Sequence, residues 1–531
     1  MPSFNFFQFL FGSNVHGTDQ SDLIVGTFDK DHLNGKGGDD LILGLFGGDK
    51  ISGGDGEDHL FGGFGKDVIV GNVGNDQMFG DQGDDRLIWN NGDGSDLMDG
   101  GKGHDQVQVN FDTDLVNDDL QNKDVAEISV TDKGVQFARI EVNDQTERGL
   151  FQLDIRNTET LETNFGDGDD TAVIKDEVLE EILLDLDGGD GEDLLDLSQA
   201  SDGVAVDLQA GELDDSTAEN FENVIGTEFD DELKGDEQDN DISGLGGADN
   251  ILGRAGDDIL VGGKGGDVVN GGRGDDALVW NNGDGSDRLN GGKDEDLVQV
   301  NFDTDLVNDD LQNKDVAEIS VTDKGVQFAR TEVNDQSDFG LFQLDILNTE
   351  TLETNFGDGD DTAVIKDDLL DKILLDLDGG DGLDLLDLGQ AAAAVEVDLD
   401  AGTIGTTAGA SSSTAVNFEQ VTGTAFDDTI RGNDQDNVIR GGVGNDILSG
   451  GKGADAFVFF EEDAGVDIIL DFEVGVDRLQ FFTTDPAVTT DNLLGNMAQV
   501  GNHVELALNN KVITFEDTAM ADFGADDFMI M

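Results

Sequence analysis

Cysteine is absent from the sequence, so no disulfide can stabilise the fold. No stretch approaches the roughly 20 apolar residues that a membrane-spanning helix needs. The amino-terminal MPSFNFFQFLFG has no basic region, no continuous apolar segment and no small-residue cleavage site, so it does not look like a conventional signal peptide. If the chain is exported, we expect another export signal, and metal ions in place of disulfides.

Basic residues are scarce: 28 Lys and Arg stand against 120 Asp and Glu, a net charge of -92. A polyanion without a basic stripe excludes nucleic acid as a partner. Two like charges about 4.8 Å apart repel by roughly 3 to 4 kcal/mol at an effective dielectric near 20, whereas a whole domain is stable by only about 5 to 15 kcal/mol. Without a cation, most of this chain would therefore stay disordered.

Recognisable catalytic motifs are also missing. The sequence has neither an HExxH zinc motif nor a GxSxG nucleophile elbow. Paired carboxylates carry no information in a chain with 120 of them. We therefore expect no enzyme activity. The five histidines show no ligand or triad spacing: His16, His32, His59, His104 and His503.

A nine-residue repeat dominates what is present. In-register repeats fill residues 17–88, 226–279 and 423–458, eighteen in all. Position one is always glycine, position eight is always large and apolar, and position six is aspartate in sixteen repeats, with Asn240 and Asn437 as exceptions. Eighteen repeats do not keep the same register by chance, so the repeat predicts a solenoid.

The spacing also predicts the geometry. Glycines permit tight turns, and residues seven to nine form a short strand whose central side chain, such as Ile24 or Leu33, points inward. Two repeats make one turn, so repeats i and i+2 stack about 4.8 Å apart and their aspartates form columns. Calcium accepts roughly six to eight oxygen ligands in loose geometry, which carboxylates and turn carbonyls can supply, whereas magnesium fits less well.

GGDGEDHLF at 53–61 and GGVGNDILS at 441–449 resemble the GGxGxDxUx consensus of the RTX, or hemolysin-type, calcium-binding repeat family. The resemblance implies an all-β parallel β-roll that folds on calcium after type I secretion. It also implies calcium ligand roles for the position-six aspartates, including those of four isolated nonapeptides: Asp22, Asp31, Asp40, Asp49, Asp58, Asp67, Asp76, Asp85, Asp105, Asp193, Asp231, Asp249, Asp258, Asp267, Asp276, Asp296, Asp384, Asp428, Asp446 and Asp455.

The first two repeats of each run lack the glycine at position four that the other twelve repeats have. Two repeats are one solenoid turn, so we predict that each run opens with a capping turn that binds calcium weakly or not at all. The residues in place of glycine are Gln20, Asp29, Phe229, Gln238, Phe426 and Gln435.

An internal duplication relates residues 35–200 to 226–391 at a constant offset of 191. Between the repeats, each copy holds alternating stretches such as AEISV, GVQFAR and LFQLDI, which predict strands and a hairpin. Two interpretations remain open for this insert. It presents a sugar- or surface-binding face with Trp89 and Trp280 as stacking platforms, or both tryptophans cap the preceding roll and the insert widens the solenoid.

Both ends of the chain have two interpretations as well. The final ADFGADDFMIM resembles an uncleaved type I secretion signal, or it is a terminal strand that caps the roll. The amino-terminal phenylalanines anchor the chain on a membrane or partner, or they cap the first roll: Phe4, Phe6, Phe7, Phe9 and Phe11.

Together these features predict a calcium-binding RTX protein, secreted or on the surface of a Gram-negative bacterium, with a structural or adhesive role. The alternatives are an RTX toxin or bacteriocin, and an exoenzyme with an unrecognised site in the insert. Expected partners are several Ca²⁺ ions, the type I secretion apparatus, and cell-surface polysaccharide or further copies of the chain. The expected domains are 1–16, a cap; 17–108, 226–299 and 423–458, β-rolls; 109–187 and 300–378, inserts; 188–225 and 379–422, connecting segments; and 459–531, a cap with the secretion signal.

Overall fold

The computed structural model describes residues 8–111, 124–142, 150–302, 315–332, 341–407, 413–486, 488–508 and 510–531. The chain forms two compact units, Met1–Val261 and Gly262–Met531. Both units are built almost entirely of β-strands, and parallel pairing dominates. Within the described ranges, no helix is long and apolar enough to cross a membrane.

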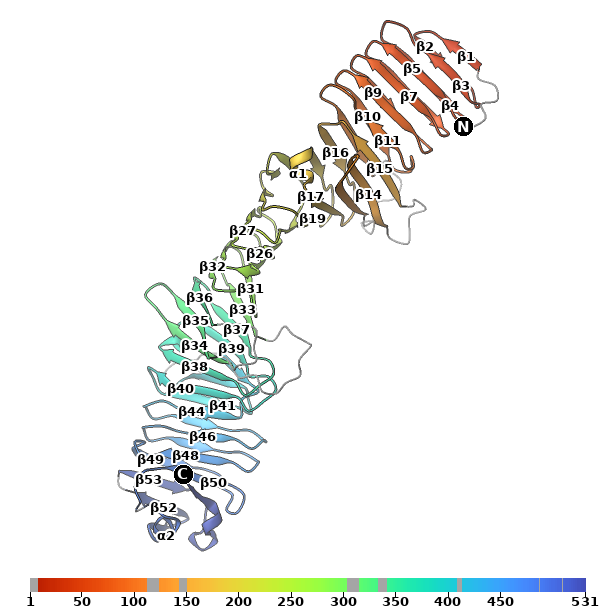
Figure 1. Ribbon diagram of the computed structural model, residues 1–531. Coiled ribbons are helices and arrows are strands. Elements are labelled where there is room, and N and C mark those ends of the chain that lie inside the picture. Colours follow the sequence, from red (N-terminus) through yellow and green to blue (C-terminus); the bar gives the residue numbers. More distant parts are fainter. Residues whose placement is uncertain are drawn as a thin grey trace. The chain divides into compact units, whose positions relative to one another are not determined.

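The first unit begins with a parallel β-roll whose strands stack as rungs (Figure 1). Leu23 pairs with Leu41 and Leu33 with Ile51, a separation of two repeats, so the predicted stacking of repeats i and i+2 is confirmed. One sheet, the first sheet, contains β1 (Gln8–Phe11), β3 (Asp22–Val25), β5 (Leu41–Phe46), β7 (His59–Phe64), β9 (Gln77–Gln82) and β11 (Leu97–Asp99). The facing second sheet contains β2 (Asn14–His16), β4 (His32–Gly37), β6 (Lys50–Asp55), β8 (Val68–Val70), β10 (Arg86–Asn90) and β12 (Gln106–Asn110).

The position-eight side chains of both sheets fill the core of this roll, as the alternation predicts. Ile24, Ile42 and Leu60 have no exposed surface. Many strands are longer than the predicted three residues, because pairing resumes after the glycine at position one. In the β4–β6 pair, for example, the register continues past that glycine to Lys36 and Gly54.

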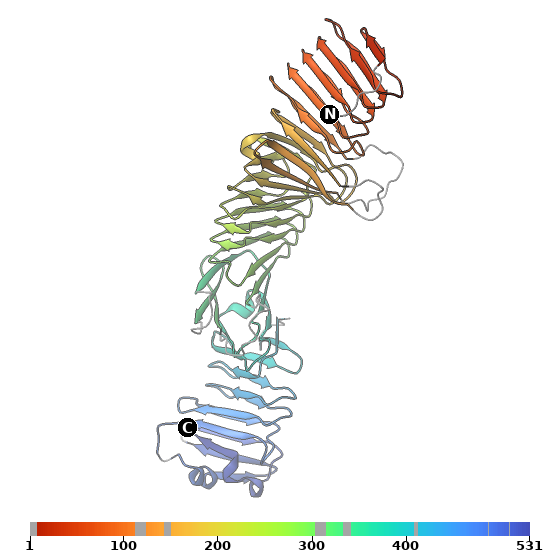
Figure 2. The ribbon, with the colours of Figure 1, turned by 45° about the vertical axis from the view of Figure 1, so that its right-hand side comes forward.

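The duplicated insert widens the roll instead of interrupting it (Figure 2). Strands β13 (Asp124–Thr131) and β14 (Gly134–Val142) form the predicted antiparallel hairpin, and β14 pairs antiparallel with β15 (Phe151–Arg156). At its two edges, β15 pairs parallel with β11, and β13 pairs parallel with β17 (Thr171–Asp176). The interpretation of the insert as a wider part of the solenoid is therefore confirmed.

After the hairpin, the first unit returns to stacked parallel strands and enters the second run of repeats. The elements are β16 (Thr160–Asn164), α1 (Val178–Glu181), β18 (Leu183–Asp187), β19 (Leu194–Ala200), β20 (Ala205–Asp207), β21 (Glu212–Leu213), β22 (Ser216–Glu219), β23 (Asn223–Ile225), β24 (Glu232–Lys234), β25 (Asp241–Ser243), β26 (Gly246–Gly247), β27 (Asn250–Ala255) and β28 (Ile259–Val261).

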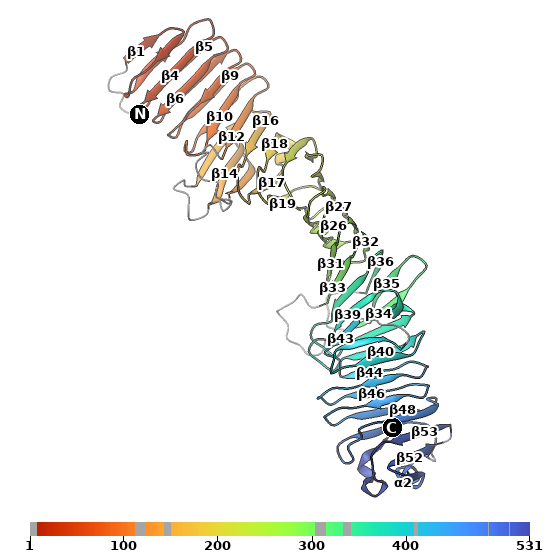
Figure 3. The same ribbon diagram turned by 180° about the vertical axis from the view of Figure 1, so that it is seen from behind.

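The second unit repeats this plan (Figure 3). Its insert contains the hairpin of β34 (Val316–Val321) and β35 (Val326–Glu332), followed by β36 (Phe342–Leu347). The strands before it are β29 (Lys264–Gly265), β30 (Val268–Arg273), β31 (Ala277–Asn281), β32 (Arg288–Lys293) and β33 (Leu297–Asn301). Those after it are β37 (Thr351–Asn355), β38 (Thr362–Asp367), η1 (Leu369–Asp371), β39 (Leu374–Asp378), β40 (Leu385–Ala391), β41 (Val395–Asp398), β42 (Thr403–Thr406) and β43 (Ser413–Val416).

The third run and a carboxyl-terminal cap complete the second unit. The final strand β54 (Phe528–Ile530) pairs parallel with β50 (Arg478–Phe482), so the chain does end in a strand that caps the roll. Strand β44 (Gln420–Thr422) directly precedes the run, whose strands are β45 (Thr429–Arg431), β46 (Val438–Arg440), β47 (Ile447–Ser449) and β48 (Ala456–Phe460). The cap adds β49 (Gly465–Ile469), α2 (Thr490–Gly495), β51 (Met497–Val500), β52 (His503–Leu508), β53 (Lys511–Phe515), η2 (Met520–Asp522) and η3 (Ala525–Asp527).

At the amino end, β1 pairs parallel with β3 and places Phe11 beside Val25. The residues around Phe9 therefore cap the first sheet of the roll, which is one of the two interpretations of the amino terminus. Phe4, Phe6 and Phe7 lie outside the described residues.

Candidate metal centres

The position-six aspartates form continuous buried columns along each roll. Within a column, the backbone N–H of one aspartate donates to Oδ1 of the aspartate one turn later. The donor–acceptor distance is 2.7 Å from Asp22 to Asp40, 2.7 Å from Asp40 to Asp58 and 2.8 Å from Asp58 to Asp76. From Asp40 to Asp76, one oxygen of each carboxylate thus ties its turn to the preceding turn.

The second carboxylate oxygen is the unusual atom of the column. Buried polar atoms are nearly always hydrogen-bonded, and an ionised oxygen buried without a partner is costly. At eleven of the predicted positions, Oδ2 is buried and has no hydrogen-bond partner within the described part of the chain: Asp40, Asp49, Asp58, Asp67, Asp76, Asp85, Asp105, Asp193, Asp296, Asp384 and Asp446.

The pKa values of the column aspartates reflect the same lack of a partner for the buried carboxylate. Burial is the largest cause that raises the pKa of Asp40 to about 7. The backbone hydrogen bond from Asp22 opposes this rise, and neighbouring aspartates contribute to it. Burial likewise raises the pKa of Asp76 and Asp85 to about 7. Without a cation these carboxyl groups would hold a proton near neutral pH, so the columns are built for a positive charge.

Glycine at position one lets oxygen atoms converge beside this orphaned oxygen. A Cβ atom placed on Gly62 would lie 2.5 Å from Oδ2 of Asp67 and 2.9 Å from the carbonyl oxygen of Gly80, one turn later. At position four, a Cβ atom on Gly56 would collide with the carbonyl oxygen of Gly38. The glycines therefore keep a cradle of carboxylate and carbonyl oxygens open along the turns.

This donor set fits calcium. Hard carboxylate and carbonyl oxygens from adjacent turns meet its need for several ligands in loose geometry. The described residues contain no group of three or more His, Cys, Asp or Glu side chains that could hold a metal ion alone. The carbonyl oxygens beside Oδ2, such as that of Gly80, are candidate ligands together with the carboxylates.

The structure places all twenty predicted aspartates in the buried columns, each with at most 4% of its surface exposed. The isolated nonapeptides continue the columns in register. The N–H of Asp85 donates to Asp105 at 2.7 Å, and the N–H of Asp361 donates to Asp384, also at 2.7 Å. The position of these side chains is established, and their role as ligands stays a proposal.

The opening repeats of the runs satisfy their aspartates in a different way. The first repeat of the second and third runs has threonine at position two. The N–H and the hydroxyl of this threonine both donate to the position-six carboxylate, which we call a clasped carboxylate. The Thr227 N–H donates to Oδ2 of Asp231 at 2.6 Å, and the Thr227 hydroxyl donates to Oδ1 at 2.9 Å. Thr424 makes the same two bonds to Asp428, at 2.6 and 2.8 Å. These carboxylates therefore have protein donors on both oxygens.

The two asparagine exceptions in the columns lie in the second opening repeats. Oδ1 of Asn240 accepts the backbone N–H of Asp236 at 2.8 Å, and its Nδ2 donates to the carbonyl oxygen of Glu222 at 2.8 Å. Asn437 makes the equivalent bonds with Asn433 and Glu419, at 2.8 and 3.4 Å. The amide group thus bridges two turns through its own donor, at a place where an aspartate would need a cation.

Sequence reasoning missed six aspartates that belong to the columns. Asp96 accepts the N–H of Asp76 at 2.7 Å, and Asp170 accepts that of Asp124 at 2.6 Å. Their segments, NGDGSD and FGDGDD, keep glycine at positions two and four but not at position one, so a strict nine-residue phase passes over them. A search for GxGxD would have found both. The other four are Asp287, Asp361, Asp467 and Asp477, each of which accepts the N–H of a column residue.

Each insert also contributes a buried cation of its own. Arg139 is 2% exposed, with Nη2 3.0 Å from Oδ2 of Asp124 and its guanidinium 4.7 Å from the centre of the Phe111 ring. Arg330 is placed in the same way beside Asp315 and Phe302. A guanidinium therefore lies beside the aspartate column where the roll widens.

The hypothesis that tryptophans serve as stacking platforms is wrong. Trp89 and Trp280 have 0% and 1% of their surface exposed, so neither ring face can receive a sugar. Trp89 packs on Phe151 with ring centroids 3.9 Å apart, and its Nε1 donates to the carbonyl oxygen of Gly94 at 2.9 Å. Both tryptophans fill the core where the roll meets the insert.

Stacked nonapeptides, glycine turns and buried aspartate columns define a calcium-binding β-roll. The family model of the RTX calcium-binding nonapeptide repeat matches residues 16–51, 52–87, 92–116, 220–251, 243–278 and 422–457. These matched segments are therefore RTX calcium-binding nonapeptide repeats.

Other comparisons add little. No curated protein matches the chain. Among solved structures, the extracellular lipase LipA from Serratia marcescens is similar with 16% sequence identity and a TM-score of 0.20. That alignment covers 64% of this chain and 45% of the lipase chain, so the chain spans less than half of the lipase.

Proposed function

We propose that the chain is an exported structural or adhesive protein of a Gram-negative bacterium that becomes ordered when its rolls bind extracellular calcium. The observation that supports this most directly is the orphaned Oδ2 atom repeated along the aspartate columns. Each such oxygen raises the free energy of the metal-free fold, and a divalent cation beside it removes that cost.

The ions would be held by the position-six aspartates that lack protein donors at Oδ2, together with turn carbonyls such as those of Gly38 and Gly80. Calcium supplies positive charge between the columns and links successive turns. Asp96 and Asp170 join the proposed ligands, because their Oδ2 atoms are buried and have no partner among the described residues. The clasped Asp231 and Asp428 and the two asparagines form turns that need no ion.

Calcium dependence would also separate export from folding. Extracellular calcium-binding modules have dissociation constants of about 0.1 to 1 mM, far above the calcium concentration inside cells. Binding free energy that is available only outside the cell becomes folding free energy there. A chain with a net charge of -92 would thus remain unfolded for type I secretion and fold after it. The acidic and apolar carboxyl end is the proposed secretion signal.

We further propose that the protein is not an enzyme. The inserts, which are the best place for an unrecognised active site, have interiors packed with aromatic rings such as Phe111, Phe137 and Phe165. This packing supports a scaffold role. Cell-surface polysaccharide, the secretion apparatus and other copies of the chain are the proposed partners besides calcium.

Cell fractionation tests this role. We expect the chain outside the producing cells, retained on their surface in millimolar calcium and released by a chelator. A chain with residues 521–531 deleted should stay inside the cells if the carboxyl end is the signal. A soluble pool that kills neighbouring cells would contradict the structural role, and an unchanged export of the truncated chain would contradict the proposed signal.

A further inference from the structure

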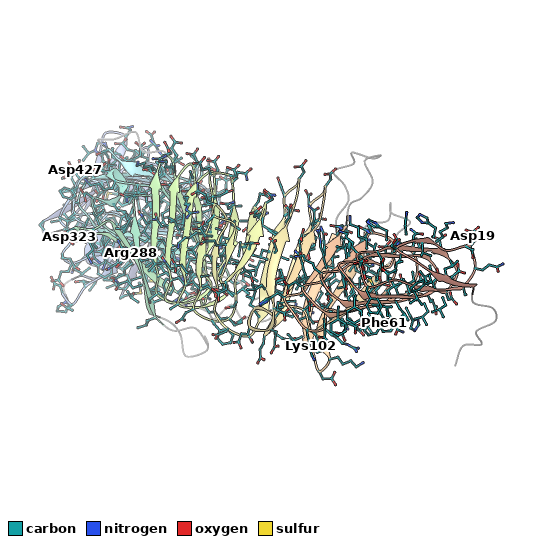
Figure 4. The ribbon with its side chains drawn as sticks, turned by 90° about the horizontal axis from the view of Figure 1, so that it is seen from above. Asp19, Phe61, Lys102, Arg288, Asp323 and Asp427 are labelled. Carbon is teal, nitrogen blue, oxygen red and sulfur yellow. The ribbon has the colours of Figure 1, made fainter. Side chains whose placement is uncertain are left out.

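Five phenylalanines form two ladders along the amino-terminal roll: four lie in strands β5, β7 and β9 of the first sheet, and Phe28 lies in the bend between β3 and β4. Phe28, Phe46 and Phe64 stack with ring centroids 5.1 and 4.8 Å apart, and Phe61 stacks on Phe79 at 4.8 Å. Phe28 is 78% exposed, Phe46 41% and Phe64 47%. We call these five residues the phenylalanine face. Phe61 is labelled in Figure 4 along one side of the roll, together with Lys102.

The roll does not need this face in order to fold. The second copy of the duplicated module forms the corresponding strands β27 and β30 with Ala255 and Asn270 in place of Phe64 and Phe79. It has Glu237 in place of Phe46, within an opening repeat. A large exposed apolar surface in a soluble protein usually marks an interaction site. The second copy therefore indicates that the roll can form without these phenylalanines. This points to a binding role that is specific to the first roll.

The stacking geometry limits the chemistry of the partner. Planes of Phe46 and Phe64 differ by 6°, and those of Phe61 and Phe79 by 8°, so each ladder hides its ring faces against one another. Sugars and bases stack on free aromatic faces, which the ladders offer only at their end rings, such as the 78% exposed Phe28. The exposed ring edges form an apolar ridge that repeats once per solenoid turn. A partner sheet with an apolar ridge of the same period can pack against it.

Charge also favours a second copy over a lipid surface. Near the face, the charged residues Asp81 and Lys102 lie at one end, beside Phe46 and Phe64, in a chain whose net charge is -92. Anionic lipid repels such a chain, whereas two copies that meet at this nearly neutral face bring their least repulsive surfaces together. Apolar sheets pack face to face about 10 Å apart, and a two-fold axis makes one patch serve both partners.

We propose that the phenylalanine face pairs with the same face of a second copy of the chain. Pairing needs a folded roll, so it rests on the calcium-dependent folding proposed above. Four strands spaced about 4.8 Å apart, with up to six residues at about 3.3 Å each, cover about 400 Å² per copy in projection, or about 800 Å² for the pair. Stable complexes bury about 1,200 Å² or more, so the pairing is weak and reversible.

Sedimentation equilibrium of the full chain in millimolar calcium, over a concentration series up to about 0.5 mM, tests the proposal. The variant carries Phe46→Glu, Phe64→Ala and Phe79→Asn, the residues of the second copy. The control carries Val70→Asn on the second sheet. We expect the wild type and the control to approach the dimer mass, and the variant to associate at least about tenfold more weakly.

Circular dichroism in calcium shows that each protein is folded, so failure of folding is distinguished from failure of pairing. If the triple variant does not fold, the single variant Phe64→Ala replaces it. A folded wild type that stays monomeric at all concentrations overturns the proposal, as does a folded variant that dimerises like the wild type. Binding of the wild type but not the variant to neutral phosphatidylcholine vesicles, without self-association, would identify a lipid partner instead.

Discussion

At the scale of single residues, one atom at position six distinguishes the turns that we propose to need an ion from those that do not. Oδ2 of Asp58 is buried without a partner among the described residues. Asn240 instead bridges two turns with its own amide. At Asp231, Thr227 supplies hydrogen-bond donors to the carboxylate. Three solutions to the same buried position thus occur within one molecule. The sequence alone shows the substitutions, but only the hydrogen bonds show their effect.

Asp58→Asn removes a carboxylate from the middle of a column, and the exposed Asp39→Asn removes the same charge outside it. We expect isothermal titration calorimetry to show at least one ion fewer for Asp58→Asn, with affinity at the neighbouring sites about tenfold lower, because each ion loses a charged ligand. Asp39→Asn should bind the wild-type number of ions. Equal stoichiometry for the two variants would show that position six is not the ligand position.

The raised pKa values predict how the metal-free chain responds to pH. Burial raises the pKa of Asp40, Asp76 and Asp85 to about 7, against roughly 3.9 for an unfolded aspartate. The folded state therefore binds protons more tightly, so its stability is greatest below about pH 4 and is lost as the pH rises through about 7. In chelator, β-structure measured by circular dichroism should decrease from pH 5 to pH 8. In millimolar calcium it should stay constant, and a chelated chain with more β-structure at pH 8 than at pH 5 would contradict this.

At the scale of elements, the second and third runs begin with a turn that the protein satisfies by itself, whereas Oδ1 of Asp22 in the first run is buried without a partner among the described residues. In the second and third runs the clasped carboxylate also receives a backbone N–H from the preceding segment, from Val204 to Asp231 and from Val395 to Asp428, both at 2.8 Å. These turns connect the roll to the segment before it without an ion. They form a template on which the calcium-dependent turns can order.

Asn240→Asp should convert such a turn into one that needs calcium. The variant loses the Nδ2 bond to Glu222 and places a carboxylate beside that carbonyl, so the metal-free form should lose about 1 to 3 kcal/mol of stability. Calorimetry should then show about one additional calcium ion. Asn223→Asp adds the same charge outside the column and serves as the control. An unchanged ion count for Asn240→Asp would contradict the role given to the amide.

The repeat period was sufficient to predict the strands, the inward side chain, the two-repeat turn and the stacking of the aspartates. It was not sufficient for Asp96 and Asp170, because their segments replace the first glycine and shift the phase while keeping the turn. Nor could it predict the buried Arg139, whose pairing with Asp124 depends on a hairpin that only tertiary contacts align. Local phase determines the roll, whereas long-range packing determines the insert.

At the scale of the whole molecule, folding requires that the negative charge be compensated. A net charge of -92 opposes any compact state, and the described columns bury part of the acidic charge, including the twenty predicted aspartates, instead of leaving it in solvent. Arginines and asparagines compensate this at a few turns only. The proposed source of most of the compensation is calcium from outside the chain, which would link the folding of both units to the calcium concentration.

Circular dichroism and small-angle X-ray scattering of the full chain at pH 7.5, first in chelator and then through a calcium titration, measure this link directly. The predicted result is an expanded chain with little β-structure in chelator, and a cooperative change to the compact β-rich state at about 0.1 to 1 mM calcium. The same β-signature and radius of gyration in excess chelator as in millimolar calcium would contradict it.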